Sequence, residues 1–331
     1  MDTLEALNRL PSTPQETAWL QARMETLSVR ESMILGAALM SGDVHNGCDL
    51  VNVFQAMQDY EVCYPAGSYA HLGRFYLAHE AQLPEDIPDF IDTEQLGKNY
   101  EDEHPGLFIG NSYVEYPNQG PALRYDGTNL AACMDDGWSV KVKLASERCP
   151  DGVWLRLPDY GDANDGKPDE TRITLDELGV KTVDECTLLD ARCILPQVGN
   201  LMEQYDRPSD LIYDGQNLGF VLDEHGQGKA NFMELYVGAL EYEDCGTLAE
   251  ALDIAENLNR YELVPMKALR EYAQKELEKQ GITLPPLAAE AFQYEEYAAQ
   301  CLQDNGFVLN TAEDAYIGKT QTQRFADMFM Q

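Results

Sequence analysis

The chain has 331 residues, and 44% of them are hydrophobic, so it is long and apolar enough to form buried cores. It carries 58 Asp and Glu against 23 Lys and Arg, a formal net charge of −35 at pH 7. A surface of this sign repels nucleic acid and anionic lipid and attracts basic proteins. The composition therefore argues against nucleic acid or a membrane as a direct partner.

Two further features point to the cytoplasm. No apolar run reaches the roughly 18 residues that a membrane-spanning helix needs, and residues Met1 to Leu7 lack the basic and apolar regions of a signal peptide. The eight cysteines are scattered without a C-x-x-C pair, which is typical of reduced thiols. We therefore predict a cytoplasmic protein.

The acidic residues are distributed along the whole chain rather than concentrated in a tail. Residues 1–118 hold 19 acidic and 5 basic residues, residues 119–226 hold 21 and 10, and residues 227–331 hold 18 and 8. They interleave with apolar residues, which indicates a folded acidic surface. At this point two interpretations stay open: a surface that keeps the protein soluble, and a surface that imitates the charge of DNA.

Residues 1–118 are predicted to form a helical segment followed by a small α+β unit. Apolar residues recur at helical spacing in 17–24, 33–40 and 49–54, and a Thr-x-x-Glu capping box precedes the first of these segments. Residues 60–64 alternate like a strand, and residues 69–79 are predicted to be helical.

Residues 119–226 are predicted to form a β-rich middle domain. Val140–Leu144 and Val153–Leu157 alternate with period two on either side of a Pro-Asp-Gly turn, which predicts a β-hairpin. A short helix is expected to open at Thr174. Two similar Asp-Gly segments, residues 125–131 and 213–219, are each expected to place a turn before a strand.

Residues 227–331 repeat the order of the first segment. Tyr60-Glu61 and Tyr261-Glu262 each begin a short strand, and a helix, a proline-marked turn and a second acidic segment follow in both. We therefore predict an α+β fold in which two related small α+β units, residues 1–118 and 227–331, flank the middle domain and present a strongly acidic surface.

Motifs for catalysis and metal binding do not meet their chemical requirements. Gly161 to Lys167 has the spacing of a P-loop, but Pro168 stands where Mg²⁺ requires Ser or Thr, and two aspartates in the loop would repel phosphate. The stretch does not fit an EF-hand, and the five histidines form no H-E-x-x-H pattern. We predict a protein that is not an enzyme and has no cofactor and no metal site. A hydrolase with a carboxylate site in a deep pocket stays open as an alternative.

Four short motifs in the first unit carry a family resemblance. They are Leu72-Gly73-Arg74-Phe75-Tyr76-Leu77, the acidic segment Pro88 to Gly97, Gly106-Leu107-Phe108, and Tyr113-Val114. The pattern resembles the ArdA-type antirestriction proteins of conjugative elements. It covers residues 45–117 and, more weakly, 232–318, where Gln293 and Ala298 stand for Asp92 and Gly97. It does not extend to the middle segment.

This resemblance implies a non-enzymatic DNA mimic, usually a homodimer, whose acidic face occupies the DNA-binding groove of type I restriction-modification enzymes. Two alternatives stay open: a mimic directed at another DNA-binding defence protein, such as a CRISPR effector or another immune nuclease, and an acidic interaction module without mimicry. The candidate phosphate-mimicking acids are Asp86, Asp89, Asp92, Glu94, Glu101, Asp102 and Glu103 in the first unit and Glu241, Glu243, Asp244, Glu290, Glu295 and Glu296 in the second.

Overall fold

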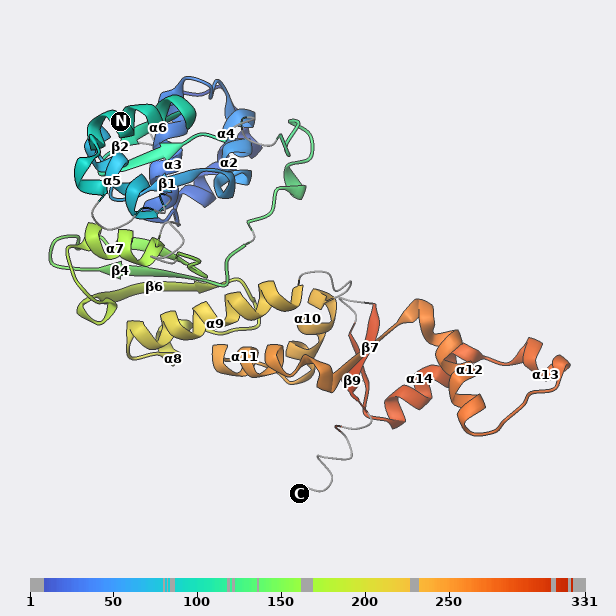
Figure 1. Cartoon of the computed structure of the whole chain (residues 1–331). Helices are drawn as coiled ribbons and strands as arrows, with labels where there is room; N and C mark the ends of the chain where they lie inside the picture. Colours follow the sequence, from blue (N-terminus) through green and yellow to red (C-terminus); the bar gives the residue numbers. More distant parts are fainter. Residues whose placement is uncertain are drawn as a thin grey trace. The chain divides into compact units, whose positions relative to one another are not determined.

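The structure is a computed structural model that describes residues 9–79, 81, 83, 87–117, 120, 123–135, 137–161, 169–226, 232–310, 314–320 and 323. Within these residues the fold is mixed α+β, with thirteen α-helices and three antiparallel three-stranded sheets (Figure 1). The α+β class predicted from the sequence is thus confirmed. None of the helices in this part of the chain is long and apolar enough to cross a membrane.

The chain divides into two compact units. Unit 1 comprises the described residues up to Ile194 together with Tyr205–Gln216, and unit 2 comprises Leu195–Gln204 and the described residues from Asn217 onward. Unit 1 contains α2 (Pro14–Met24), α3 (Val29–Ser41), α4 (Gly47–Gln55), β1 (Glu61–Cys63), α5 (Tyr69–His79), α6 (Thr93–Glu103), β2 (Gly106–Ile109), β3 (Ser112–Glu115), β4 (Val140–Ala145), β5 (Val153–Leu157), α7 (Glu170–Leu178) and β6 (Thr187–Cys193). Unit 2 contains α8 (Leu201–Gln204), α10 (Phe232–Tyr242), α11 (Leu248–Glu256), β7 (Tyr261–Pro265), α12 (Leu269–Lys279), α13 (Pro286–Ala291), α14 (Tyr294–Asp304), β8 (Val308–Asn310) and β9 (Ala315–Lys319). The division crosses α9 (Pro208–Gly226).

The three predicted N-terminal helices of unit 1 are present, but α3 begins at Val29 and α4 at Gly47, ahead of the segments 33–40 and 49–54 that the sequence predicts. The predicted capping box of Thr13 and Glu16 opens α2, and Ser28 with Glu31 forms a second one at α3. The apolar faces of these helices and of α4 form one buried core with Val62 of the first sheet.

The first sheet of unit 1 has the strand order β1-β3-β2 and is packed against the helix pair α5–α6 (Figure 1). Gly73 of α5 and Gly97 of α6 lie where the two helices cross. A Cβ atom at Gly73 would collide with the backbone oxygen of Thr93, and one at Gly97 would collide with that of Tyr69. Only glycine permits the backbones to approach so closely.

The second sheet of unit 1 has the strand order β5-β4-β6. The predicted hairpin of β4 and β5 is confirmed, with Val142 opposite Leu155. The helix expected to open at Thr174 begins four residues earlier, at Glu170. Asp169 is its N-cap and accepts the backbone N–H of Arg172, so Thr174 is an interior, buried residue.

The prediction for residues 213–219 is wrong. They lie inside the 19-residue helix α9, and residues 125–131 lead into the 3₁₀ turn η3 (Leu130–Ala132) rather than into a strand. Gly215 of α9 fits closely against Val140 and Leu157 of the sheet, and its carbonyl accepts the hydroxyl of Ser139. Here glycine serves helix–sheet packing, and no turn forms. The middle segment consequently has more helix than predicted.

Unit 2 has the same strand connectivity as the first sheet of unit 1. Its sheet has the order β7-β9-β8, in which β9, the last strand, lies between the other two, as β3 does between β1 and β2. A helix and a short 3₁₀ turn, α4 with Met57–Asp59 or α11 with Leu258–Arg260, lead into the first strand of each sheet. Between the first and second strands lie α5 and α6 in unit 1, and α12 and α14 with the short α13 between them in unit 2. Ala273 and Ala298, both fully buried, occupy the positions in α12 and α14 that Gly73 and Gly97 occupy in unit 1.

Candidate functional site

Nearly all the described carboxylates lie at least partly at the surface. The acidic side chains that are buried in the described part of the chain are Glu16, Glu31 and Glu115. Each has a partner inside unit 1: the hydroxyl of Tyr125 donates to Glu16, Arg156 pairs with Glu31, and the hydroxyl of Tyr100 donates to Glu115. These three acids therefore have structural roles, whereas the exposed acids are available to water or to a partner.

The first candidate acids of unit 1 gather at the start of α6. Asp89 is exposed in the 3₁₀ turn Pro88–Phe90, whereas Asp86 lies outside the described residues. Asp92 is the N-cap of α6, and its Oδ1 accepts the backbone N–H groups of Glu94 and Gln95. Glu94 is exposed and pairs with Lys98 at 2.8 Å. An exposed pair of this kind contributes little to stability, so Glu94 stays free to exchange partners.

The other candidates of unit 1 lie at the end of the same helix. Asp102 and Glu103 are exposed, whereas Glu101 is half-buried and accepts the hydroxyl of Tyr69 at 2.7 Å. That bond raises the pKa of the tyrosine. At a rise of 1.5 Å per residue, about 12 Å of helix separates the two acidic ends of α6.

The candidates of unit 2 lie on three elements. Glu241, Glu243 and Asp244 are exposed at the end of α10, where Asp244 adopts a left-handed φ of 54°. Two of them have partners within the unit: Glu241 accepts the side-chain amide of Asn310 at 2.6 Å, and Glu243 accepts the hydroxyl of Tyr261 and pairs with Lys319.

The remaining candidates of unit 2 are exposed to solvent. Glu290 lies on α13, a short helix with no buried residue, and Glu295 and Glu296 lie in the first turn of α14. The N-cap of α14 is Gln293, which makes no side-chain capping bond, unlike Asp92 at the start of α6. Glu295 thus occupies in unit 2 the place that Glu94 occupies in unit 1, without the capping carboxylate beside it.

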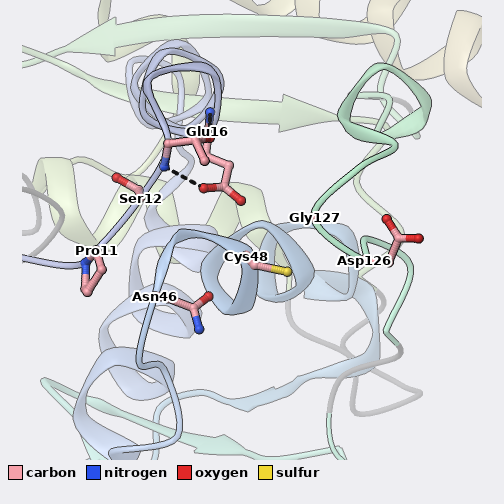
Figure 2. Close-up of a pocket in the computed structure, with 8 residues that line it drawn as sticks. Pro11, Ser12, Glu16, Asn46, Cys48, Asp126 and Gly127 are labelled. Atoms are coloured by element: carbon pink, nitrogen blue, oxygen red, sulfur yellow. Dashed lines mark hydrogen bonds between the residues drawn. The ribbon is translucent and has the colours of Figure 1, made fainter.

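A shallow cavity of about 380 Å³ in unit 1 lies between the start of α2, the start of α4 and the turn at Gly127 (Figure 2). The reactive groups around it are engaged. Glu16 accepts the backbone N–H of Thr13, Cys48 donates its thiol to the carbonyl of Tyr125, and burial raises the pKa of that thiol. Hydrogen bonds from Thr128 lower the pKa of Asp126. These bonds favour a structural role for the cavity.

A second cavity of about 330 Å³ is one that sequence reasoning did not identify. It includes Glu170, whose pKa is raised to about 7, first by burial and next by the charge of Glu31. In sequence Glu170 is one acid among 58 Asp and Glu. In the structure its side chain is half-buried, with its Oε2 atom out of contact with solvent. Among the described residues, no group of three or more His, Cys, Asp or Glu is placed to hold a metal ion.

A scan against protein-family models, a search of curated proteins and a search of solved structures each found no match for this chain.

Proposed function

We propose that this protein is a non-enzymatic DNA mimic that inhibits type I restriction-modification enzymes by competing with DNA through a distributed surface of carboxylates. The observation that carries the proposal is the exposure of the acidic residues: eleven of the thirteen candidate acids are exposed, Glu101 is half-buried, and Asp86 is not described. Many exposed carboxylates on a folded surface present a field like that of the DNA backbone and release counterions when a basic groove binds them.

We further propose that the chain contains a duplicated α+β unit. The support is the shared strand order of the sheets β1-β3-β2 and β7-β9-β8, with a helix pair inserted at the same place. Under this proposal the three parts predicted from the sequence, 1–118, 119–226 and 227–331, are an ArdA-like unit, a middle domain and a second, diverged unit. A homodimer in the cytoplasm would bring four such acidic units to one target.

Two other functions use the same surface. The first is a DNA mimic that inhibits a different DNA-binding defence protein. Exposed carboxylates do not by themselves select one DNA-binding groove, so the same surface is compatible with such a target. The acidic surface would serve only solubility if binding to basic partners proves insensitive to salt.

The test is a displacement assay with purified components. The protein is titrated into a type I restriction-modification enzyme bound to labelled duplex DNA, at low and at high salt. We expect stoichiometric release of DNA that weakens as salt rises. Retention of DNA at every salt, while a control inhibitor releases it, would exclude this target, and a pulldown with the intact protein would then look for another.

A further inference from the structure

The cavity next to Glu170 is built from four separate segments of unit 1. Arg30 comes from the first turn of α3, Gln58 from the turn Met57–Asp59, Glu61 from the start of β1, and Tyr160 from the connection between β5 and α7. Glu170, the first residue of α7, completes the wall. A volume of about 330 Å³ lies at the lower end of the range for small-molecule sites.

The wall of this cavity is held in place by hydrogen bonds. The backbone N–H of Asp159 donates to the side chain of Gln216, and its carbonyl accepts from the same amide, at 2.7 and 2.6 Å. The Asp159 carboxylate accepts the N–H groups of Gly161, Glu170 and Thr171 and the Thr171 hydroxyl. Asp159 is therefore fully engaged and fixes the connection to α7.

Two oppositely charged groups of this cavity are left incomplete. Glu170 Oε2 and Arg30 Nε are buried and have no hydrogen-bond partner. Arg30 is positioned through another atom, Nη2, which donates to the carbonyl of Tyr60 at 2.8 Å. Buried polar atoms without hydrogen-bond partners are unfavourable, so these two atoms favour the binding of a ligand or of ordered water.

The ligand must satisfy an acid and a base at once. A simple cation would leave Arg30 Nε without a hydrogen-bond partner, and a simple anion would leave Glu170 Oε2 without one. A small zwitterion satisfies both, since its cation donates to a carboxylate and its anion accepts from a guanidinium. We propose that this cavity binds a free α-amino acid, whose ammonium group pairs with Glu170 and whose carboxylate pairs with Arg30.

The site predicts a particular dependence on pH. Burial raises the pKa of Glu170 to about 7, with the charges of Glu31 and Asp159 acting in the same direction and those of Arg30 and Arg156 in the opposite one. Glu170 is therefore largely neutral below that pH. An ammonium group needs the ionised carboxylate, so affinity rises by about tenfold between about pH 6 and about pH 8, as the ionised fraction of Glu170 rises from about a tenth to about nine-tenths.

The test uses the intact chain and does not depend on the proposed antirestriction function. Each standard L-amino acid is added at about 10 mM in a thermal-shift assay, which detects millimolar dissociation constants, and the best is measured by calorimetry. We expect one or a few amino acids to bind. The methyl ester of the best ligand, which is a cation, and its N-acetyl derivative, which is an anion, should each bind at least about tenfold more weakly than the amino acid itself. Glu170→Gln should remove binding, whereas Glu177→Gln, an exposed acid of the same helix, should not.

Three results would overturn the proposal. They are the absence of a thermal shift with every amino acid, equal binding of the ester or the N-acetyl derivative, and undiminished binding by a folded Glu170→Gln variant. The first would leave water as the occupant of the cavity. Because the ligand derivatives are compared on the unmodified chain, the proposal stays testable even if Glu170→Gln does not fold.

Discussion

Individual carboxylates in this protein have different roles, although the sequence presents them as one acidic population. Asp92 caps a helix, Glu101 holds a tyrosine hydroxyl, and Asp102 beside it is exposed to solvent. The partner of Glu101, Tyr69, is 32 residues away, so no local pattern reveals the bond. The exposure of most candidates was predictable from charge and interleaving, whereas their individual partners depend on the fold.

Two substitutions at Asp92 distinguish its role as a helix cap from the effect of its negative charge. Asp92→Ala removes the cap of α6 and should lower the free energy of unfolding by about 1 kcal/mol, whereas Asp92→Asn keeps a capping oxygen and should cost much less. Both variants remove one negative charge. Urea unfolding measures the stability difference, and equal stability of the two variants would show that the cap is not formed.

Glu170 makes stability depend on pH. Its pKa is raised from 4.5 to about 7 in the folded state, so the folded state holds the proton more tightly than the unfolded state. The resulting stabilisation, up to about 3 kcal/mol, is present below about pH 4.5 and is lost as pH rises to about 7. In Glu170→Gln this decline should disappear, with Glu177→Gln as the control. Chemical unfolding at several pH values checks it, and an unchanged decline in Glu170→Gln would contradict the assignment.

At the scale of elements, prediction succeeded where local signals and tertiary packing agree. Three predicted features are present in the structure: the capping box at Thr13, the helix over 69–79 and the hairpin of β4 and β5. It failed over 213–219, because Asp-Gly is a strong turn signal that the packing of Gly215 against the sheet overrides. Tertiary contacts of this kind cannot be predicted from the local sequence alone.

The crossing of α5 and α6 gives a prediction at this scale. Gly97→Ala places a Cβ against the backbone oxygen of Tyr69, which cannot move cheaply, so we expect a loss of about 3 kcal/mol or more in the free energy of unfolding. The converse change at the matching position, Ala298→Gly, should cost about 1 kcal/mol through helix propensity. Thermal unfolding measures both. A neutral Gly97→Ala would mean that the helices do not approach so closely.

At the scale of the whole molecule, charge is the dominant property. The net charge of −35 is spread over all three parts of the chain, and the acids buried in its described part are held by Tyr125, Arg156 and Tyr100. Mutual repulsion makes such a surface costly to maintain, and the mimicry of DNA proposed above would account for that cost. A mimic of this kind depends on many weak, salt-screened contacts.

The measurement that tests this most directly compares two triple variants in the DNA-displacement assay. Asp89→Asn/Asp102→Asn/Glu103→Gln neutralises exposed candidates, and Glu147→Gln/Asp151→Asn/Glu177→Gln neutralises as many exposed acids elsewhere in unit 1. With each exposed contact contributing about 0.2–1 kcal/mol, we expect the candidate triple to displace DNA about tenfold more weakly at low salt, with less difference at high salt. The control triple should displace DNA nearly as well as the unmodified chain. If neither triple weakens displacement, the carboxylates do not mimic DNA. If both weaken it equally, net charge alone is responsible and the candidate surface is wrong.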